Sequence, residues 1–171
     1  MALIYDPGAV RGGKFNPMFV ESLFLVAPTS VRLPRAGKDT VPLAALANLP
    51  LMLPSRIHTI RKAVEAAFVR ARIELKLIAE IESVATIASA IEAGVGSTIL
   101  PWSSARRVAG SEGAILRRIV KPGIEVKVSL CTPDQLPISD PALAVQDLIF
   151  ELIETSPEID ALRGVNRVRY D

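Results

Sequence analysis

Cysteine, histidine and aromatic side chains are scarce in this sequence of 171 residues. There is one cysteine, Cys131, and one histidine, His58, and aromatic residues make up 5% of the chain. A single cysteine excludes a disulfide within the chain, and one histidine far from one cysteine does not meet the ligand spacing of a zinc site. The sequence therefore predicts no metal, no cofactor and an aliphatic core, because half of the residues are hydrophobic.

Long apolar runs and a strong excess of either charge are also missing. No run approaches the roughly 20 residues that span a bilayer, and the first residues reach Asp6 too soon for a signal sequence. We therefore expect a soluble, cytoplasmic protein without a membrane partner. The net charge of +2 is too small to indicate nucleic-acid binding by this chain. The early loops are basic, and solvated loops are favoured over a phosphate-binding track; their cations are Arg11, Lys14, Arg32, Arg35 and Lys38.

Hydrophobic periodicity predicts strands that alternate with helices. The expected strands are 2–5 (buried), 22–27, 51–53, 75–82, 97–100, 115–119 (an edge) and 124–131. The expected helices are 42–47, 58–71, one that Ser83 caps and Gly94 ends, 103–108, and one that starts at Asp140-Pro141. The expected loops are 7–20 and 28–41, and a frayed tail follows from Ser156. This order indicates an α/β fold with largely parallel sheets.

The stretch LMLPSRIHTIRKAVEAAF, residues 51–68, contains an unusual helix start. A helix N-terminus attracts acidic side chains, yet this one gathers Ser55, Arg56, His58 and Thr59. One explanation is that a bound anion supplies the negative charge, held by backbone N–H groups, the Ser55 hydroxyl and the Arg56 guanidinium. The alternative is that Ser55 is only an N-cap and Arg56 a solvated charge.

Five segments in order resemble the effector-binding domain of LysR-type transcriptional regulators. They are MALIYD, ESLFLVAP (21–28), VPLAALANLPLMLPSR (41–56), AEIESVATIASAIEAGVGSTILP (79–101) and VKVSLCTPDQLPISDPALAVQDLI (126–149). The helix that ends in Gly-x-Gly-x-x-x-Leu-Pro is the most specific of them. The Pro-Ser-Arg loop is most similar to the nitrogen-assimilation-control branch of that family.

The resemblance implies two Rossmann-like subdomains, as in type II periplasmic binding proteins, with a small-molecule cleft between them. Subdomain I would combine 1–28 with 125–155 and would be incomplete, subdomain II would be 29–124, and 156–171 would be a C-terminal tail. The family's N-terminal winged helix-turn-helix, linker helix and first strand and helix have no counterpart here. We therefore expect a fragment of a longer regulator.

The resemblance also places effector contacts on two segments of this chain. Ser55 and Arg56 would face the cleft, with His58 at its rim, and the strand after Gly96 would line the opposite side through Thr98, Ile99 and Leu100. The glycines themselves are expected only to end a helix and start a strand. His58 lacks an activated partner in the sequence, so we predict no catalytic residue.

The predicted function is effector sensing by a LysR-type regulator. A small organic anion, a carboxylate, would change how the subunits of a homodimer or tetramer pack, and DNA would be bound only through the absent winged helix-turn-helix. A stand-alone binding protein of the same fold remains an alternative, and a small enzyme such as a dehydratase is a weaker one, because fold does not decide function.

Overall fold

The computed structural model describes residues 1–5, 12–34, 37, 39–110, 114–135 and 137–168. Arg11, Arg35 and Lys38 lie outside this part of the chain. The fold divides into two compact units, which are described separately below. Unit 1 combines Met1–Glu21 with Val126–Asp171, and unit 2 is Ser22–Glu125.

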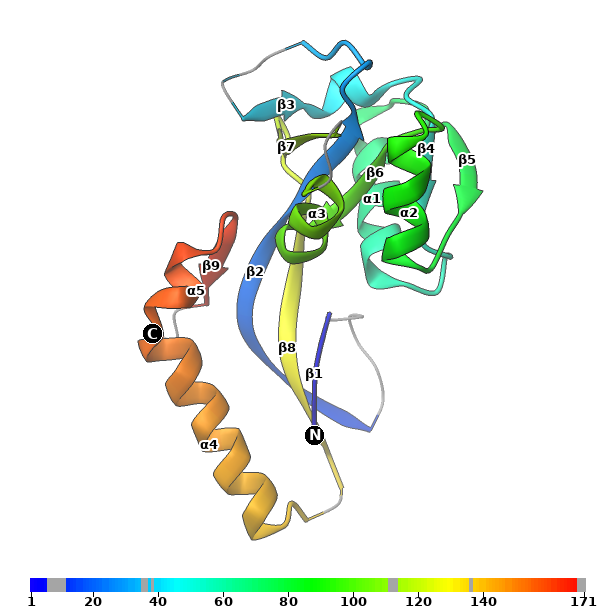
Figure 1. The fold of residues 1–171 in the computed structure, drawn as a ribbon. Coiled ribbons are helices and arrows are strands. Elements are labelled where there is room, and N and C mark those ends of the chain that lie inside the picture. The colour runs from blue at the N-terminus through cyan, green and yellow to red at the C-terminus, as the bar shows by residue number, and fades with distance from the viewer. Residues whose placement is uncertain (6–11, 35–36, 38, 111–113, 136, 169–171) are drawn as a thin grey trace. The chain divides into compact units, whose positions relative to one another are not determined.

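The secondary structure alternates as an α/β chain does (Figure 1). The strands are β1 (Ala2–Tyr5), β2 (Gly13–Pro28), β3 (Thr40–Pro42), β4 (Leu51–Leu53), β5 (Leu77–Glu80), β6 (Thr98–Pro101), β7 (Ala114–Val120), β8 (Glu125–Pro133) and β9 (Val165–Arg167). The helices are the 3₁₀ turn η1 (Leu43–Leu46), α1 (Thr59–Ala71), α2 (Val84–Glu92), α3 (Trp102–Ala109), α4 (Asp140–Thr155) and α5 (Pro157–Ala161).

Unit 2 contains three short parallel strands. β4 pairs with β5 in parallel, and a parallel bridge joins Leu51 to Ser97 at the start of β6. Each strand is followed by a helix, because polar or proline-containing turns come directly after the apolar runs: β4 leads to α1, β5 to α2 and β6 to α3. This is the repeating strand–helix connection of an α/β unit.

Helices cover these strands through aliphatic side chains. On one face α2 and α3 pack on Met52, Leu100 and the β2 residues Phe24 and Val26. Leu51, Leu53 and Ile99 alternate with that set and are fully buried, so they point to the opposite face. α1 buries Val64 and Phe68 and contacts η1. Burial on both faces explains why these strands are continuous apolar runs rather than alternating ones.

The longer strands of unit 2 pair differently. β2 pairs in antiparallel register with β6 and β7, while β3 pairs with β7 in parallel. The prediction of largely parallel sheets is therefore wrong for the strands around β2. β7 lies between β2 and β3, so residues 115–119 form an interior strand and not the expected edge. A strand's direction and neighbours depend on distant pairing, which local periodicity does not report.

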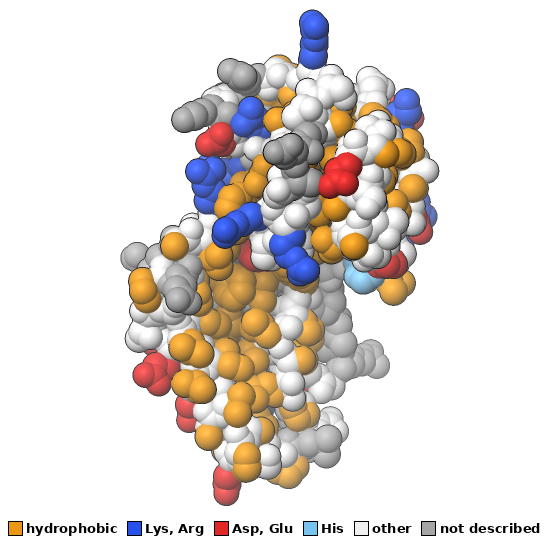
Figure 2. Space-filling model, viewed as in Figure 1, with side chains coloured by type: hydrophobic (Ala, Val, Ile, Leu, Met, Phe, Trp, Pro, Cys, Tyr) orange, Lys and Arg blue, Asp and Glu red, His pale blue; other side chains and the backbone are white. Residues whose placement is uncertain are grey.

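Unit 1 is built on β1, β8, β9 and the first half of β2. β1 pairs with β8 in antiparallel register, and β9 pairs with Phe19–Glu21 of β2. α4 packs Ile153 against Met18 and Leu130. Its other side leaves apolar residues exposed, and Figure 2 shows apolar side chains crowded over the part of unit 1 that contains α4. These residues are Leu143, Val145, Leu148 and Leu152.

Three local predictions for unit 1 are wrong. Residues 13–20 belong to β2, although the glycines and prolines of 7–20 indicated a loop, because burial of Met18 in the core outweighs those signals. The expected buried strand 2–5 is a strand, but Leu3 is 48% exposed. The tail is not frayed over 157–167: it forms α5 and β9, and Arg167 donates to the carbonyl oxygens of Glu154 and Ser156 at 2.6 and 2.7 Å.

Both ends of α2 and the place of Cys131 agree with the prediction. The hydroxyl of Ser83 caps α2 by accepting the N–H of Thr86, at 3.3 Å. Gly94 follows α2 with a φ of +72°, a left-handed conformation that glycine adopts without strain. Cys131 is half-buried in β8, as expected for a small residue of a strand.

Candidate functional site

The carboxyl ends of β4, β5 and β6 lie at one edge of the parallel strands in unit 2. The loop 54–58 follows β4, residues 81–83 follow β5, and α3 begins directly after β6. All three following helices therefore start near this edge, with their N–H groups and positive dipole ends. In open α/β sheets, ligands bind outside the carboxyl ends of the strands. This edge is the candidate site.

Ser55 and His58 meet a carboxylate of the chain itself. The backbone N–H of Ser55 donates to Glu82 Oε1 at 3.0 Å, and His58 Nε2 lies 2.7 Å from Glu82 Oε2. His58 is also the residue that precedes α1 as its N-cap, without a side-chain cap hydrogen bond. The alternative that Ser55 is the N-cap of this helix is therefore wrong. Glu82 supplies a negative charge at the helix start that the sequence left without an acid.

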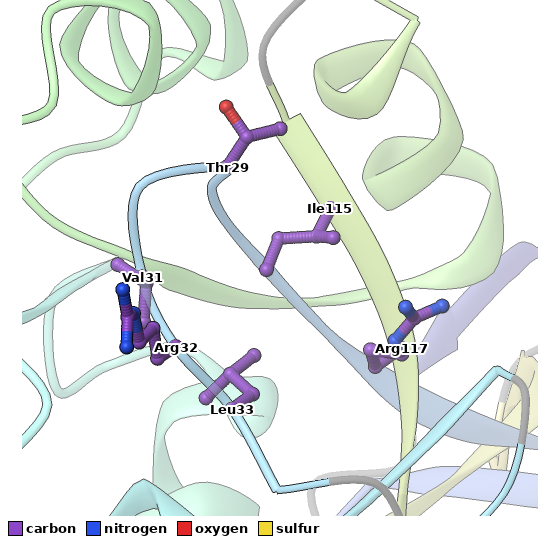
Figure 3. Close-up of a pocket in the computed structure, with 6 residues that line it drawn as sticks. All are labelled: Thr29, Val31, Arg32, Leu33, Ile115 and Arg117. Atoms are coloured by element: carbon purple, nitrogen blue, oxygen red, sulfur yellow. The ribbon is translucent and has the colours of Figure 1, made fainter.

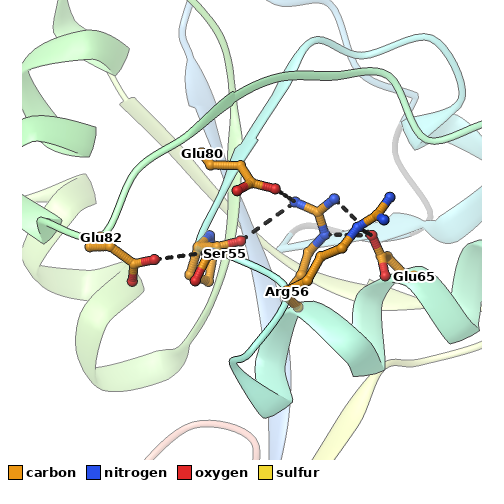
Figure 4. A network of polar contacts seen from close by, with 7 residues as sticks. Ser55, Arg56, Glu65, Glu80 and Glu82 are labelled. Atoms are coloured by element: carbon orange, nitrogen blue, oxygen red, sulfur yellow. Dashed lines mark hydrogen bonds and ion pairs between the residues drawn. The ribbon is translucent and has the colours of Figure 1, made fainter.

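Arg56 and Arg61 pair with two further glutamates, Glu65 and Glu80, which Figure 4 labels together with Arg56. Arg61, whose side chain is 1% exposed, donates to Glu65 Oε1 from Nε at 2.8 Å and from Nη2 at 2.7 Å. Its Nη1 lies 3.8 Å from Glu80 Oε1. Arg56, at 77% exposure, places Nε 3.4 Å from the same Glu65 oxygen. The chain thus provides a carboxylate for each guanidinium.

These contacts shift the titration of Glu82. Hydrogen bonds from the hydroxyl and the backbone N–H of Ser55, and then the charge of His58, lower the pKa of the Glu82 carboxyl. The carboxylate form is therefore favoured at this helix start. Because Glu82 is exposed, another anion has access to the same donors from solvent.

The three residues predicted on β6 lie deeper in unit 2. Thr98 is fully buried, and its hydroxyl donates to the Met52 carbonyl at 2.7 Å, which ties β6 to β4. Ile99 is fully buried in register with Leu25, and Leu100 belongs to the core under α2 and α3. Within unit 2, the structure therefore brings Ser55 and His58 together through Glu82, whereas Thr98, Ile99 and Leu100 serve the sheet beside them.

Sequence reasoning missed the three glutamates. Glu80 and Glu82 fall on the exposed side of an alternating strand, which favours solvated charge, and Glu65 lies on a helix. One signal was available: the pair 80 and 82 shares one strand face with even spacing. That signal does not say which cations the face will meet, because this depends on how β5 pairs with β4.

Unit 1 holds a polar pair of its own. The Tyr5 hydroxyl donates to Glu21 Oε2 at 2.8 Å, and Glu21 is 7% exposed. Burial raises the pKa of the Glu21 carboxyl, against the opposing effect of the Tyr5 hydrogen bond. Burial, together with the Glu21 charge and hydrogen bond, also raises the pKa of Tyr5.

Among the described residues, no group of three or more His, Cys, Asp and Glu side chains is placed to hold a metal ion. Within the same residues, no helix combines the length and the apolarity needed to cross a bilayer.

Comparison with known proteins gives a family and relatives. Residues 1–153 match the model of the LysR substrate binding domain. The chain is 35% identical over 155 residues to the nitrogen assimilation regulatory protein nac of Escherichia coli (strain K12). That match covers 91% of this chain and 49% of the relative, so the chain spans about half the length of the relative.

Solved structures agree on the fold. The Synechocystis PCC6803 CcmR regulatory domain in complex with 2-PG has a TM-score of 0.76 at 19% identity, and covers 90% of this chain and 73% of that chain. The effector binding domain of QuiR in complex with shikimate has a TM-score of 0.75 at 19% identity. This match covers 90% of this chain and 70% of that chain. The chain has the fold that these regulatory domains share with type II periplasmic binding proteins, and it belongs to the LysR substrate-binding domain family.

Proposed function

We propose that this chain is the effector-sensing domain of a bacterial LysR-type transcriptional regulator and binds a small organic carboxylate at the edge formed by Ser55, Arg56 and His58. The observation that carries the proposal is that the Glu82 carboxylate already contacts the donors of Ser55 and His58. The Ser55 N–H and His58 Nε2 contact it at 3.0 and 2.7 Å. The same donors are suited to the carboxylate of an effector.

In this proposal the effector takes the place of Glu82. Arg56 is 77% exposed and only 3.4 Å from one oxygen of Glu65, so its remaining donors are available for a two-pronged contact with a carboxylate. Thr98, Ile99 and Leu100 would form the strand next to the loop. They would support the site through their backbone and packing, and the Thr98 hydroxyl would not contact the effector. QuiR supports the chemical class, since shikimate is a carboxylic acid.

The response to the effector would depend on an equilibrium between two arrangements of a longer protein. An effector that binds one arrangement more tightly shifts the equilibrium toward it. We propose that the longer regulator binds DNA through an N-terminal winged helix-turn-helix, acts in the cytoplasm as a homodimer or tetramer, and has no enzymatic activity. The nac relatives, which are named as regulatory proteins, support this assignment.

The test is a thermal-shift titration with shikimate, other small organic acids and their neutral amides. At about one hundred times its dissociation constant, a ligand adds roughly 2.7 kcal/mol to the free energy of unfolding. We expect an acid to raise the melting temperature of the parent and to raise that of Arg56→Ala less. Glu82→Gln should respond at a lower acid concentration, because the side chain that competes with the effector is then neutral.

Arg70→Gln is the matched control, since Arg70 is an exposed arginine at the other end of α1. It should respond as the parent does. If acids stabilise all four proteins equally, the anion binds elsewhere and the Ser55 edge is not the effector site. If no acid stabilises a cooperatively melting parent, the carboxylate assignment fails.

A further inference from the structure

A pocket elsewhere in unit 2 differs from the Ser55 edge in position and in charge. It has a volume of about 270 Å³ and lies between the segment that follows β2 and the strand β7 (Figure 3). Its lining residues are Thr29, Val31, Arg32, Leu33, Ile115 and Arg117.

Strand register explains why β7 contributes one arginine to this pocket. Leu116 packs on the core under α2 and α3, so its neighbours Ile115 and Arg117 point to the other face of the strand. Across the ladder, Ile115 lies opposite Ala27 and Arg117 opposite Leu25. The pocket therefore combines an apolar strand position with a cation on the same face.

The cationic side chains that line this pocket outnumber their carboxylate partners. The Arg117 side chain is 19% exposed, and its Nη1 lies 3.3 Å from Asp39 Oδ1. Asp39 is 47% exposed and makes a further contact of its own, so its charge is shared. Arg32 is exposed, and among the described residues it forms no ion pair or hydrogen bond. Two arginines thus line one cavity, and one carboxylate partner is described for them.

We propose that this pocket binds a small amphipathic anion, with its carboxylate or phosphate head on Arg32 and its short branched hydrocarbon body on Leu33 and Ile115, while Arg117 adds positive charge from the other side of the pocket. Guanidinium groups match both kinds of head, and the Thr29 hydroxyl can add a hydrogen bond. The volume lies slightly below the range of about 300–1,000 Å³ typical of ligand pockets, which favours a small body. The site is independent of the Ser55 edge and of the proposed effector.

The experiment is an NMR titration of the whole chain with three probes of one shape: 3-methylbutanoate, 2-methylpropyl phosphate and the neutral 3-methylbutanamide. We expect the methyl and amide signals of Val31, Leu33 and Ile115 to shift with both anions and not with the amide. The ratio of the two affinities distinguishes a carboxylate site from a phosphate site. Shifts with the amide as large as with the acids would overturn the anion assignment.

Arg32→Gln tests the charge without disturbing an ion pair. We expect it to weaken anion binding about tenfold, as loss of one charge-assisted contact does, while Arg70→Gln leaves binding unchanged. Arg56→Ala should also leave these shifts unchanged, which separates this pocket from the Ser55 edge. Equal affinity in Arg32→Gln and the parent, or shifts confined to residues 55–58, would refute the proposal.

Discussion

Four arginines of unit 2 form two pairs that differ in their carboxylate partners. Arg56 and Arg61 pair with Glu65 and Glu80, at distances between 2.7 and 3.8 Å. Arg32 and Arg117 share one pocket with a single aspartate contact, at 3.3 Å. An anion at the Ser55 edge would therefore have to replace a carboxylate of the chain, whereas an anion at Arg32 would not.

Arg61 and Arg32, one from each pair, differ in their share in folding. Arg61 is buried and bonded to α1 and β5 residues, so it belongs to the structure that holds the helix on the strands. Arg32 is exposed and without a described partner. Removal of a buried, paired arginine destabilises the fold strongly, whereas removal of an exposed, unpaired one changes the free energy of unfolding little.

The largest expected effect is that of Arg61→Ala. Removal of a buried guanidinium leaves a cavity and frees Glu65 and Glu80, and we expect a loss of about 3 kcal/mol in the free energy of unfolding. Arg32→Ala should change it by less than about 0.5 kcal/mol. Urea denaturation of both variants measures the contrast. Equal losses would abolish the distinction between these two arginines.

The next effect concerns Thr98, a polar group whose partner lies inside the sheet. Thr98→Val keeps the shape and removes the donor to the Met52 carbonyl, so we expect a loss of about 1–2 kcal/mol. The same denaturation experiment, with a thermal melt as a second probe, measures it. An unchanged stability would mean that the hydroxyl is dispensable for the fold and available to an effector.

Glu21 extends the comparison to an acid that is buried without a described cation. Its pKa is raised in the folded state above the ordinary 4.5, so the folded chain binds the proton more tightly than the unfolded chain. The resulting cost is absent below the unfolded pKa and grows as the pH rises through the folded pKa. Glu21→Gln, which still accepts from Tyr5, should therefore raise the melting temperature at neutral pH.

This gain should shrink as the pH falls below about 4.5. Melting curves between pH 3 and pH 8 measure it. A variant less stable than the parent at pH 7 would show that the ionised Glu21 stabilises the fold.

The smallest effect, with the opposite sign, is expected at Glu82. Its pKa is lowered in the folded state, so its contribution to stability is present above the ordinary pKa of 4.5 and is lost as the pH falls through the folded value. Glu82→Gln should be slightly less stable than the parent at neutral pH and equal to it in acid. The same melting series measures it, and a difference that persists at low pH would contradict the assigned cause.

Local chemistry made a large part of the fold predictable. The alternation over 75–82, the Ser83 cap and the positive φ of Gly94 follow from neighbouring residues alone. β2 was predicted too short, because the turn signals at its start compete with a core contact of Met18 that is distant in sequence. At the candidate site, Ser55 and His58 were predicted to lie together, but the acid between them was not predicted.

The sequence by itself determined the alternating elements, the family and the basic helix start at residues 55–59, since these depend on periodicity, capping and local charge. Only the tertiary structure decided which carboxylate meets which cation. β4 and β5 change register between Leu51 and Met52, which places Glu80 opposite Leu53 and brings Glu82 to Ser55. A shift of one residue would turn those carboxylates to the other face, and no short-range pattern specifies it.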